Sequence, residues 1–239
     1  MTPVHSPAET SHAFLTAVKR GEECESFRTT IATMPEARLT SLDRDRRAAL
    51  AFWINLYNAF VQFDLERDPS LYERKRRFFG DDRHIVAGTT LSLDDIEHGI
   101  LRSSKWKYGL GYVPRPFPSA FERTYRLDEV DPRIHFALNC GAESCPPILA
   151  YTCDSIDGEL DASTRSFLDQ SSAYDRDVGE LWVSRLFLYY RGDFGGRQGV
   201  YEFLERYGVL EERDRPRVRY SEYDWTRHTG MYRFGSGEE

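Results

Sequence analysis

Residues 50–65 have the sequence LAFWINLYNAFVQFDL, in which large apolar side chains recur every three or four positions. The residues that follow this spacing are Leu50, Trp53, Ile54, Tyr57, Val61 and Leu65. The spacing predicts an amphipathic helix, which we expect to extend over residues 42–66. Ser41 or Asp43 is expected to cap it, because a short polar side chain can accept hydrogen bonds from the free N–H groups of a first turn.

Shorter patterns on both sides of this helix predict further elements. Helical spacing predicts helices within residues 10–34, 94–102, 155–171 and 200–207. Residues 85–93 are expected to form a hairpin around Gly88, and residues 181–190 to begin as a strand and continue as a helix. Residues 218–225 are expected to be a strand or irregular. Together these elements predict an α+β fold: a helix-rich single domain with a small, mainly antiparallel sheet.

The length of 239 residues fits one large domain. We expect residues 1–40 to form an N-terminal helical extension and residues 41–234 to form the main domain. Residues 235–239 are expected to be a disordered tail.

The composition, 40% hydrophobic and 30% charged, is typical of a soluble globular protein. A net charge of −7 argues against a nucleic-acid partner, which would require a basic face. No apolar run approaches the ~20 residues of a membrane helix, and residues 1–10 do not resemble a signal peptide. We therefore expect a cytoplasmic protein without a membrane partner, whose four cysteines are free thiols.

Residues 131–147 have the sequence DPRIHFALNCGAESCPP, which concentrates the reactive side chains of the chain. The apolar residues at alternate positions are Ile134, Phe136 and Leu138. This period of two predicts a strand, with His135 and Asn139 together on its other face. Gly141 is expected to begin a tight turn at the end of the strand.

Cys140 and Cys145, close to His135, admit three interpretations. Free cysteines often pack as small buried hydrophobic residues. Alternatively, one of them is a nucleophile whose pKa is lowered by the imidazole of His135 or of His98. The third interpretation is redox or metal chemistry. However, the Cys-x4-Cys spacing is not that of common redox motifs, and no second cysteine pair exists for structural zinc. We therefore expect no metal and no cofactor.

Polar residues on two predicted helices could complete such a site. Asn55 and Asn58 share a helix face, where they either bridge to a neighbouring loop or orient a substrate carbonyl. Glu97 could fix the tautomer of His135 or pair with an arginine. Arg102 could bind an anionic substrate group or form a buried ion pair.

Three further polar positions lie in predicted turns. Asn139, or the backbone N–H groups after it, could hold an oxyanion. Asp193 and Asp224 are expected to satisfy backbone groups, with Asp224 as an alternative partner for an imidazole.

Several segments resemble the DUF547 family, and together they span roughly residues 45–226. They are residues 52–59 (FWINLYNA), 91–98 (LSLDDIEH) with Leu101-Arg102, 134–147, 186–194 with Asp193-Phe194, and 223–225 (YDW). The resemblance implies a globular, largely helical α+β module. It implies no particular reaction.

The hypothesis that follows is a Cys/His-dependent hydrolase or acyltransferase acting on a small molecule or a peptide. The expected catalytic residues are Cys145, Cys140, His135, Glu97 and His98. The expected substrate-binding residues are Asn55, Asn58, Asn139, Ser144 and Arg102. The alternatives are a non-catalytic binding or scaffold module with a hydrogen-bonded polar core, and a thiol redox protein. The sequence does not decide between them, nor does it identify the substrate or the oligomeric state.

Overall fold

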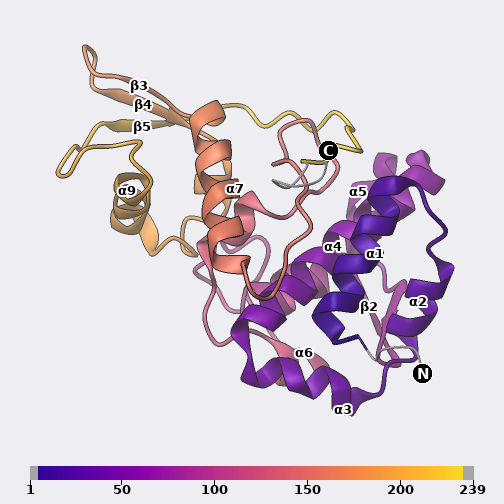
Figure 1. Ribbon diagram of the computed structural model, residues 1–239. Coiled ribbons are helices and arrows are strands. Elements are labelled where there is room, and N and C mark those ends of the chain that lie inside the picture. Colours follow the sequence, from indigo (N-terminus) through magenta and orange to yellow (C-terminus); the bar gives the residue numbers. More distant parts are fainter. Residues whose placement is uncertain (1–4, 234–239) are drawn as a thin grey trace.

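The computed structural model describes residues 5–233, in which helices surround one long central helix. One small sheet projects at one end of the molecule, and the other lies among the N-terminal helices (Figure 1). The α-helices are α1 (Pro7–Arg20), α2 (Glu25–Ala32), α3 (Glu36–Leu39), α4 (Arg46–Arg67), α5 (Lys75–Gly80), α6 (Ala120–Tyr125), α7 (Ile156–Ser171), α8 (Leu186–Tyr189) and α9 (Gly196–Arg206). Three 3-10 helices, η1 (Thr40–Arg44), η2 (Pro69–Arg74) and η4 (Pro132–Phe136), and one π-helix, η3 (Asp95–Leu101), connect them. The strands are β1 (His84–Val86), β2 (Thr89–Leu91), β3 (Ala173–Asp175), β4 (Glu180–Val183) and β5 (Arg217–Tyr220).

Helix α4 is the helix predicted from the apolar spacing, and it is capped later than expected. The carboxylate of Asp45 accepts hydrogen bonds from the N–H groups of Arg47 and Ala48, at 3.0 and 3.2 Å. The prediction of Ser41 or Asp43 as the cap is wrong, because those residues belong to η1.

The centre of the core is α4 itself. Residues 49–62 are buried on every side of the helix, so α4 lies inside the protein rather than presenting one apolar face to it. Helix α1 packs along α4, where the ring of Phe14 meets that of Phe60 edge-on at 5.7 Å. Residues of the predicted N-terminal extension thus contribute to the same core, and the boundary at residue 40 stays a prediction.

The buried apolar residues form two clusters. The larger surrounds α4, and the smaller gathers aromatic residues of η4, α7, α8 and α9, such as Phe136, Phe187 and Phe203. Figure 1 shows β3, β4, β5 and α9 at one end of the molecule, α1 to α4 at the other, and α7 between them. Tyr223 packs against both clusters.

The two sheets are small, and antiparallel pairing predominates. β1 and β2 form the predicted hairpin, and Gly88 in its turn has a positive φ of 78°. In the second sheet β4 pairs antiparallel with β3 and parallel with β5. The α+β class is therefore confirmed, as are helices within residues 10–34, 155–171 and 200–207.

The strand predicted around Ile134 is wrong. Asp131 accepts a hydrogen bond from the Arg133 N–H at 3.1 Å, and Pro132 begins the 3-10 helix η4 in its place. Proline suits a first helical turn, where no N–H is needed. His135 and Asn139 therefore do not share a strand face.

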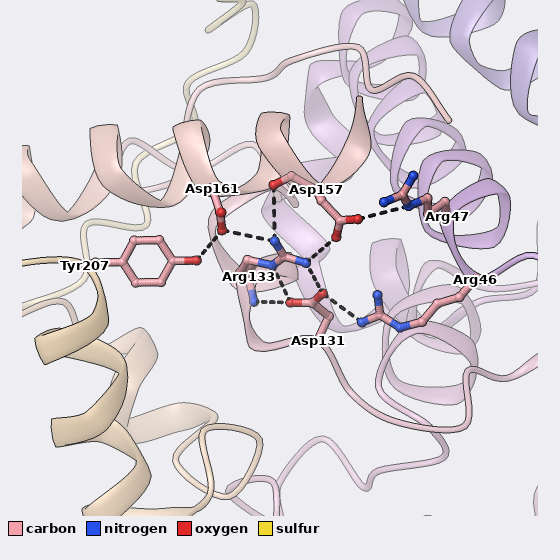
Figure 2. Close-up of polar contacts among 7 residues, drawn as sticks. All are labelled: Arg46, Arg47, Asp131, Arg133, Asp157, Asp161 and Tyr207. Atoms are coloured by element: carbon pink, nitrogen blue, oxygen red, sulfur yellow. Dashed lines mark hydrogen bonds and ion pairs between the residues drawn. The ribbon is translucent and has the colours of Figure 1, made fainter. Parts of the chain in front are cut away.

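Arg133 fastens η4 to the neighbouring helices (Figure 2). Its guanidinium contacts both oxygens of Asp131 at 2.9 and 2.7 Å, Asp157 at 2.9 Å and Asp161 at 3.0 Å. Arg46, at the start of α4, reaches Asp131 at 2.8 Å. Burial acts to raise the pKa of Asp131, but the hydrogen bonds from these two arginines outweigh it and lower that pKa to about 2.

The tail predicted at residues 235–239 lies outside the described residues. Within residues 5–233, no helix combines the length and the apolar character that a bilayer crossing requires.

Candidate functional site

A cavity of about 690 Å³ opens between the two apolar clusters. Its wall is assembled from distant segments: α4, α5, the start of η3, the loop after it, residues 135–146, α8 and the segment around Tyr223. The predicted catalytic residues on the wall are Glu97, His98, His135 and Cys140. A cavity of this size accommodates a small organic ligand.

His135 is held in place by two contacts. Its Nε2 lies 3.0 Å from Oδ2 of Asp193, and its ring stacks on that of Tyr190 with centroids 3.8 Å apart. Burial lowers the pKa of His135, and the nearby Asp193 only partly offsets this. The ring is therefore neutral near pH 7; because Nε2–H donates to Asp193, Nδ1 is the unprotonated, basic nitrogen.

Asp193 is the residue that the sequence interpretation missed. It is completely buried and, besides contacting His135, accepts a hydrogen bond from Arg102 Nε at 2.6 Å. Burial acts to raise its pKa, but the hydrogen bonds from His135 and Arg102 lower it to about 2. The sequence predicts that Asp193 and Asp224 satisfy backbone groups, with Asp224 as an alternative imidazole partner. Asp224 does accept a hydrogen bond from the Thr226 N–H at 2.8 Å, whereas the imidazole of His135 contacts Asp193. The Asp193-Phe194 pair within the family resemblance was the available signal.

The π-helix η3 brings three predicted site residues together. Wider helical turns of this kind are rare and recur at functional sites. Arg102 Nη1 lies 2.9 Å from Nδ1 of His98, which is four residues earlier in the chain. Arg102 is completely buried in an ion pair with Asp193. Of the two predicted roles, anion binding or a buried ion pair, the structure has the ion pair.

Glu97 is held by hydroxyl groups and not by His135. Tyr190 and Tyr57 donate hydrogen bonds to its two carboxylate oxygens, at 2.8 and 3.2 Å. Burial acts to raise the pKa of Glu97, but its electrostatic interactions with His98 and Arg102 and the hydrogen bond from Tyr190 outweigh burial and lower that pKa. Glu97 is thus an anion on the cavity wall, fully occupied by its partners.

The two cysteines form a thiol pair. Their Sγ atoms lie 2.7 Å apart, and the Tyr223 hydroxyl lies 3.3 Å from the sulfur of Cys145 and 3.6 Å from that of Cys140. The backbone N–H of Cys140 donates to the sulfur of Cys145 at 3.1 Å. Of the pair, Cys140 lines the cavity, whereas Cys145 lies behind it.

The two thiols of this pair differ in acidity. Burial acts to raise the pKa of Cys145, but hydrogen bonds from Cys140, Tyr223 and two backbone N–H groups lower it. The hydrogen bond to Cys145, followed by burial, raises the pKa of Cys140. When the pair loses its first proton, these hydrogen bonds therefore favour the charge on Cys145 over Cys140.

The turn at Gly141 makes this pairing feasible. Gly141 has a φ of 80°, and a Cβ on it would lie 2.6 Å from Leu65 Cδ1, so only glycine fits without strain. The Asn139 side chain closes the loop by accepting from the Gly141 N–H at 2.9 Å and donating to Pro146 O at 2.8 Å.

The amides predicted to bind substrate instead hold backbone groups. Asn55 pairs with both the N–H and the C=O of Tyr151 at 2.8 Å, and Asn58 pairs with Ala137 O and the Asn139 N–H at 2.9 Å. Both amides are completely buried and do not line the cavity. They therefore bridge α4 to neighbouring loops, which is the first of the two predicted roles.

Ser144 and the cysteine sulfurs also have partners other than those predicted. The Ser144 hydroxyl accepts a hydrogen bond from the Asp224 N–H at 2.8 Å and does not line the cavity. Within residues 5–233, no histidine ring is hydrogen-bonded to a cysteine sulfur. The partner of the Cys140 thiol is the second thiol.

A family model described as "Protein of unknown function, DUF547" matches residues 39–168, more than half of the 239 residues. The match includes α4, η3, η4 and both cysteines of the pair, and it ends before Tyr190, Asp193 and Tyr223. Comparisons with curated proteins and with solved structures find no match.

Proposed function

The chain belongs to the DUF547 family, and we propose that its cavity is the active site of a thiol-dependent hydrolase or acyltransferase acting on a small substrate. The observation that carries this proposal is that Cys140 lines the cavity with a proton acceptor, the Cys145 sulfur, 2.7 Å away. His135, oriented by Asp193, supplies a second acid–base group on the same wall.

In the first step Cys140 Sγ attacks the substrate carbonyl while its proton passes to the Cys145 thiolate. The carbonyl bond to the leaving group breaks, and that group departs with the proton held by Cys145. The product is a thioester on Cys140. The Cys145 sulfur suits this role, because hydrogen bonds from the Cys140 N–H and the Tyr223 hydroxyl favour its charged form.

In the second step His135 Nδ1 takes a proton from water or from an acceptor alcohol or amine, which attacks the thioester. The carbon–sulfur bond breaks, and the sulfur of Cys140 leaves with the proton from the imidazole. Asp193 is a positioning residue here, because it fixes the ring tautomer and touches no substrate.

The test uses p-nitrophenyl acetate as an acyl donor, with peptide mass spectrometry to locate the acetyl group. Acetylation of Cys140 is expected in the full chain and not in Cys140→Ser. The His135→Gln variant should still acquire the acetyl group but release it more slowly than the unmodified chain. Acetylation spread evenly over the cysteines, or absent, would favour a non-catalytic module.

Thiol redox chemistry is the second candidate, and the contact between the two sulfur atoms favours it. Two thiols would give one disulfide, two protons and two electrons, the electrons passing to a disulfide substrate. Titration against glutathione redox buffers separates the candidates. A reversible Cys140–Cys145 bond together with no acetylation would support redox chemistry.

We also propose a cytoplasmic location without a nucleic-acid partner. Free thiols at Cys24, Cys140, Cys145 and Cys153 and a net charge of −7 support it. Fractionation of the native host, with the chain found in the soluble cytoplasmic fraction, would test this.

A further inference from the structure

The charges on the cavity wall do not cancel. Asp94 pairs with Lys107, and Glu97 is occupied by Tyr57 and Tyr190, so these carboxylates have partners. The two other cations on the wall are Lys75 and Arg76, at the start of α5.

Neither of these cations has a carboxylate partner among residues 5–233. Lys75 Nζ lies 4.2 Å above the ring of Tyr72, and Arg76 has no ion pair or side-chain hydrogen bond within that range. Lys75 is half-buried and Arg76 is exposed, which places them at the mouth of the cavity. Unpaired cations at a cavity mouth favour an anionic ligand group.

The basic surface continues beyond the mouth. A second hollow of about 610 Å³ shares Arg76, Lys107 and Tyr108 with the cavity and adds Arg77. Asp81 also lies on its wall and pairs with Arg83 at 3.8 Å. The excess of positive charge therefore extends outward from Arg76, where an anionic head group would be only partly desolvated.

The remainder of the cavity wall is mainly aromatic and aliphatic. Its members include Phe79, Leu110, Leu138, Leu186 and Trp225. Such a surface favours an apolar ligand body, because burying it removes apolar area from water on both sides.

We infer that the cavity binds anionic amphiphiles: molecules with an apolar acyl or aryl body and one carboxylate or phosphate, which Lys75 and Arg76 bind at the mouth. This inference rests on the proposed function, because it names the substrate class for the same cavity. A ligand held in this way extends from the mouth along the wall that carries Cys140 and His135.

The binding test is calorimetric titration of the unmodified chain with dodecanoate, dodecyl phosphate and neutral dodecanol, each below its micelle concentration. One molecule of either anion should bind per chain, and more tightly than dodecanol. The anion that binds more tightly distinguishes a carboxylate from a phosphate head group, and either result supports the inference.

Matched variants locate the head group. Arg76→Gln should weaken dodecanoate binding about fivefold, as expected for one partly exposed charge contact, and leave dodecanol binding unchanged. Arg74→Gln makes the same change two residues earlier, on an exposed side chain outside the cavity, and should change neither. Lys75→Gln combined with Arg76→Gln should weaken dodecanoate binding further.

The Cys140→Ser variant separates this inference from the proposed function, because it should bind dodecanoate as tightly as the unmodified chain while losing acetylation. Binding without acetylation in the unmodified chain would overturn the enzyme proposal alone. Equal affinity for dodecanol and dodecanoate, equal effects of Arg74→Gln and Arg76→Gln, or no binding would overturn the ligand inference.

Discussion

Nε2 of His135 lies 3.0 Å from Oδ2 of Asp193, a residue 58 positions later in the chain. The exposed fractions of the two side chains are 1% and 0%. The contact joins η4 to the loop after α8, and it sets which imidazole nitrogen is basic. It therefore connects the folding of two distant segments to the chemistry available at the cavity.

Replacing Asp193 should destabilise the protein strongly. Asp193→Asn removes the carboxylate that pairs with buried Arg102, and breaking such a pair costs about 3 to 5 kcal/mol. Urea unfolding followed by circular dichroism measures the loss. Asp224→Asn, at an exposed carboxylate, is the control and should change stability by less than about 0.5 kcal/mol. Equal effects of the two changes would contradict the role given to Asp193.

Stability should fall in acid because of Asp131 and Asp193. Their pKa values are about 2 in the folded protein, below the ordinary value of about 3.9 in the unfolded chain. A lowered folded pKa contributes stability that is present above about pH 4 and is lost as the pH falls through 2. Each group contributes about 2.5 kcal/mol.

Unfolding midpoints measured between pH 7 and pH 2 test this pH dependence. In Asp131→Asn the loss of stability between pH 4 and pH 2 should be smaller than in the unmodified chain. An identical slope for the two proteins would show that Asp131 is not the group being protonated.

Asn55 should matter for folding and not for thiol reactivity. Asn55→Ala leaves the N–H and C=O of Tyr151 buried without partners, which costs about 2 to 3 kcal/mol. The control is Gln170→Ala, because that amide is exposed and bonds only to Ser166. If Asn55→Ala kept full stability but changed the alkylation rate of Cys140, Asn55 would be a site residue after all.

Gly141 should be less replaceable than Gly208, although both glycines have a positive φ. Gly141→Ala combines an unfavourable φ with a clash against Leu65, for an expected loss of about 2 to 3 kcal/mol. Gly208 has a φ of 77° and nothing within 4 Å of an added Cβ, so Gly208→Ala should cost only about 1 kcal/mol. Thermal unfolding of both variants measures the difference, and equal losses would exclude the clash.

The local pattern predicted the elements whose sequence period is regular. The spacing around Trp53 predicted α4, and the turn at Gly88 predicted its hairpin. The strand at Ile134 failed because residues 133–139 are all buried, so the alternation of apolar residues does not mark one buried face, and Asp131 with Pro132 begins a 3-10 helix instead. The parallel pairing of β4 with β5 depends on tertiary contacts that a period cannot reveal.

For the candidate site, the sequence identified the reactive residue types and not their partners. The hydrolase hypothesis pairs either Cys140 or Cys145 with an imidazole, whereas the loop closed by Asn139 turns the two sulfurs toward each other. Asp193 could not be matched to His135, because the two approach only when η4 packs beside the α8 loop. Such pairings depend on long-range contacts, which local propensity does not encode.

The central claim is that Cys140 and Cys145 act as one ionising pair that reacts at Cys140. The most direct measurement is the rate of iodoacetamide alkylation of each cysteine near pH 7, resolved by peptide mass spectrometry in the unmodified chain and in Cys145→Ser. We predict that Cys140 reacts faster than Cys24 and Cys153, and that Cys145→Ser slows it about tenfold, because the serine hydroxyl cannot supply the thiolate. Uniformly slow alkylation of all four cysteines, or an unchanged Cys140 rate in Cys145→Ser, would contradict the claim.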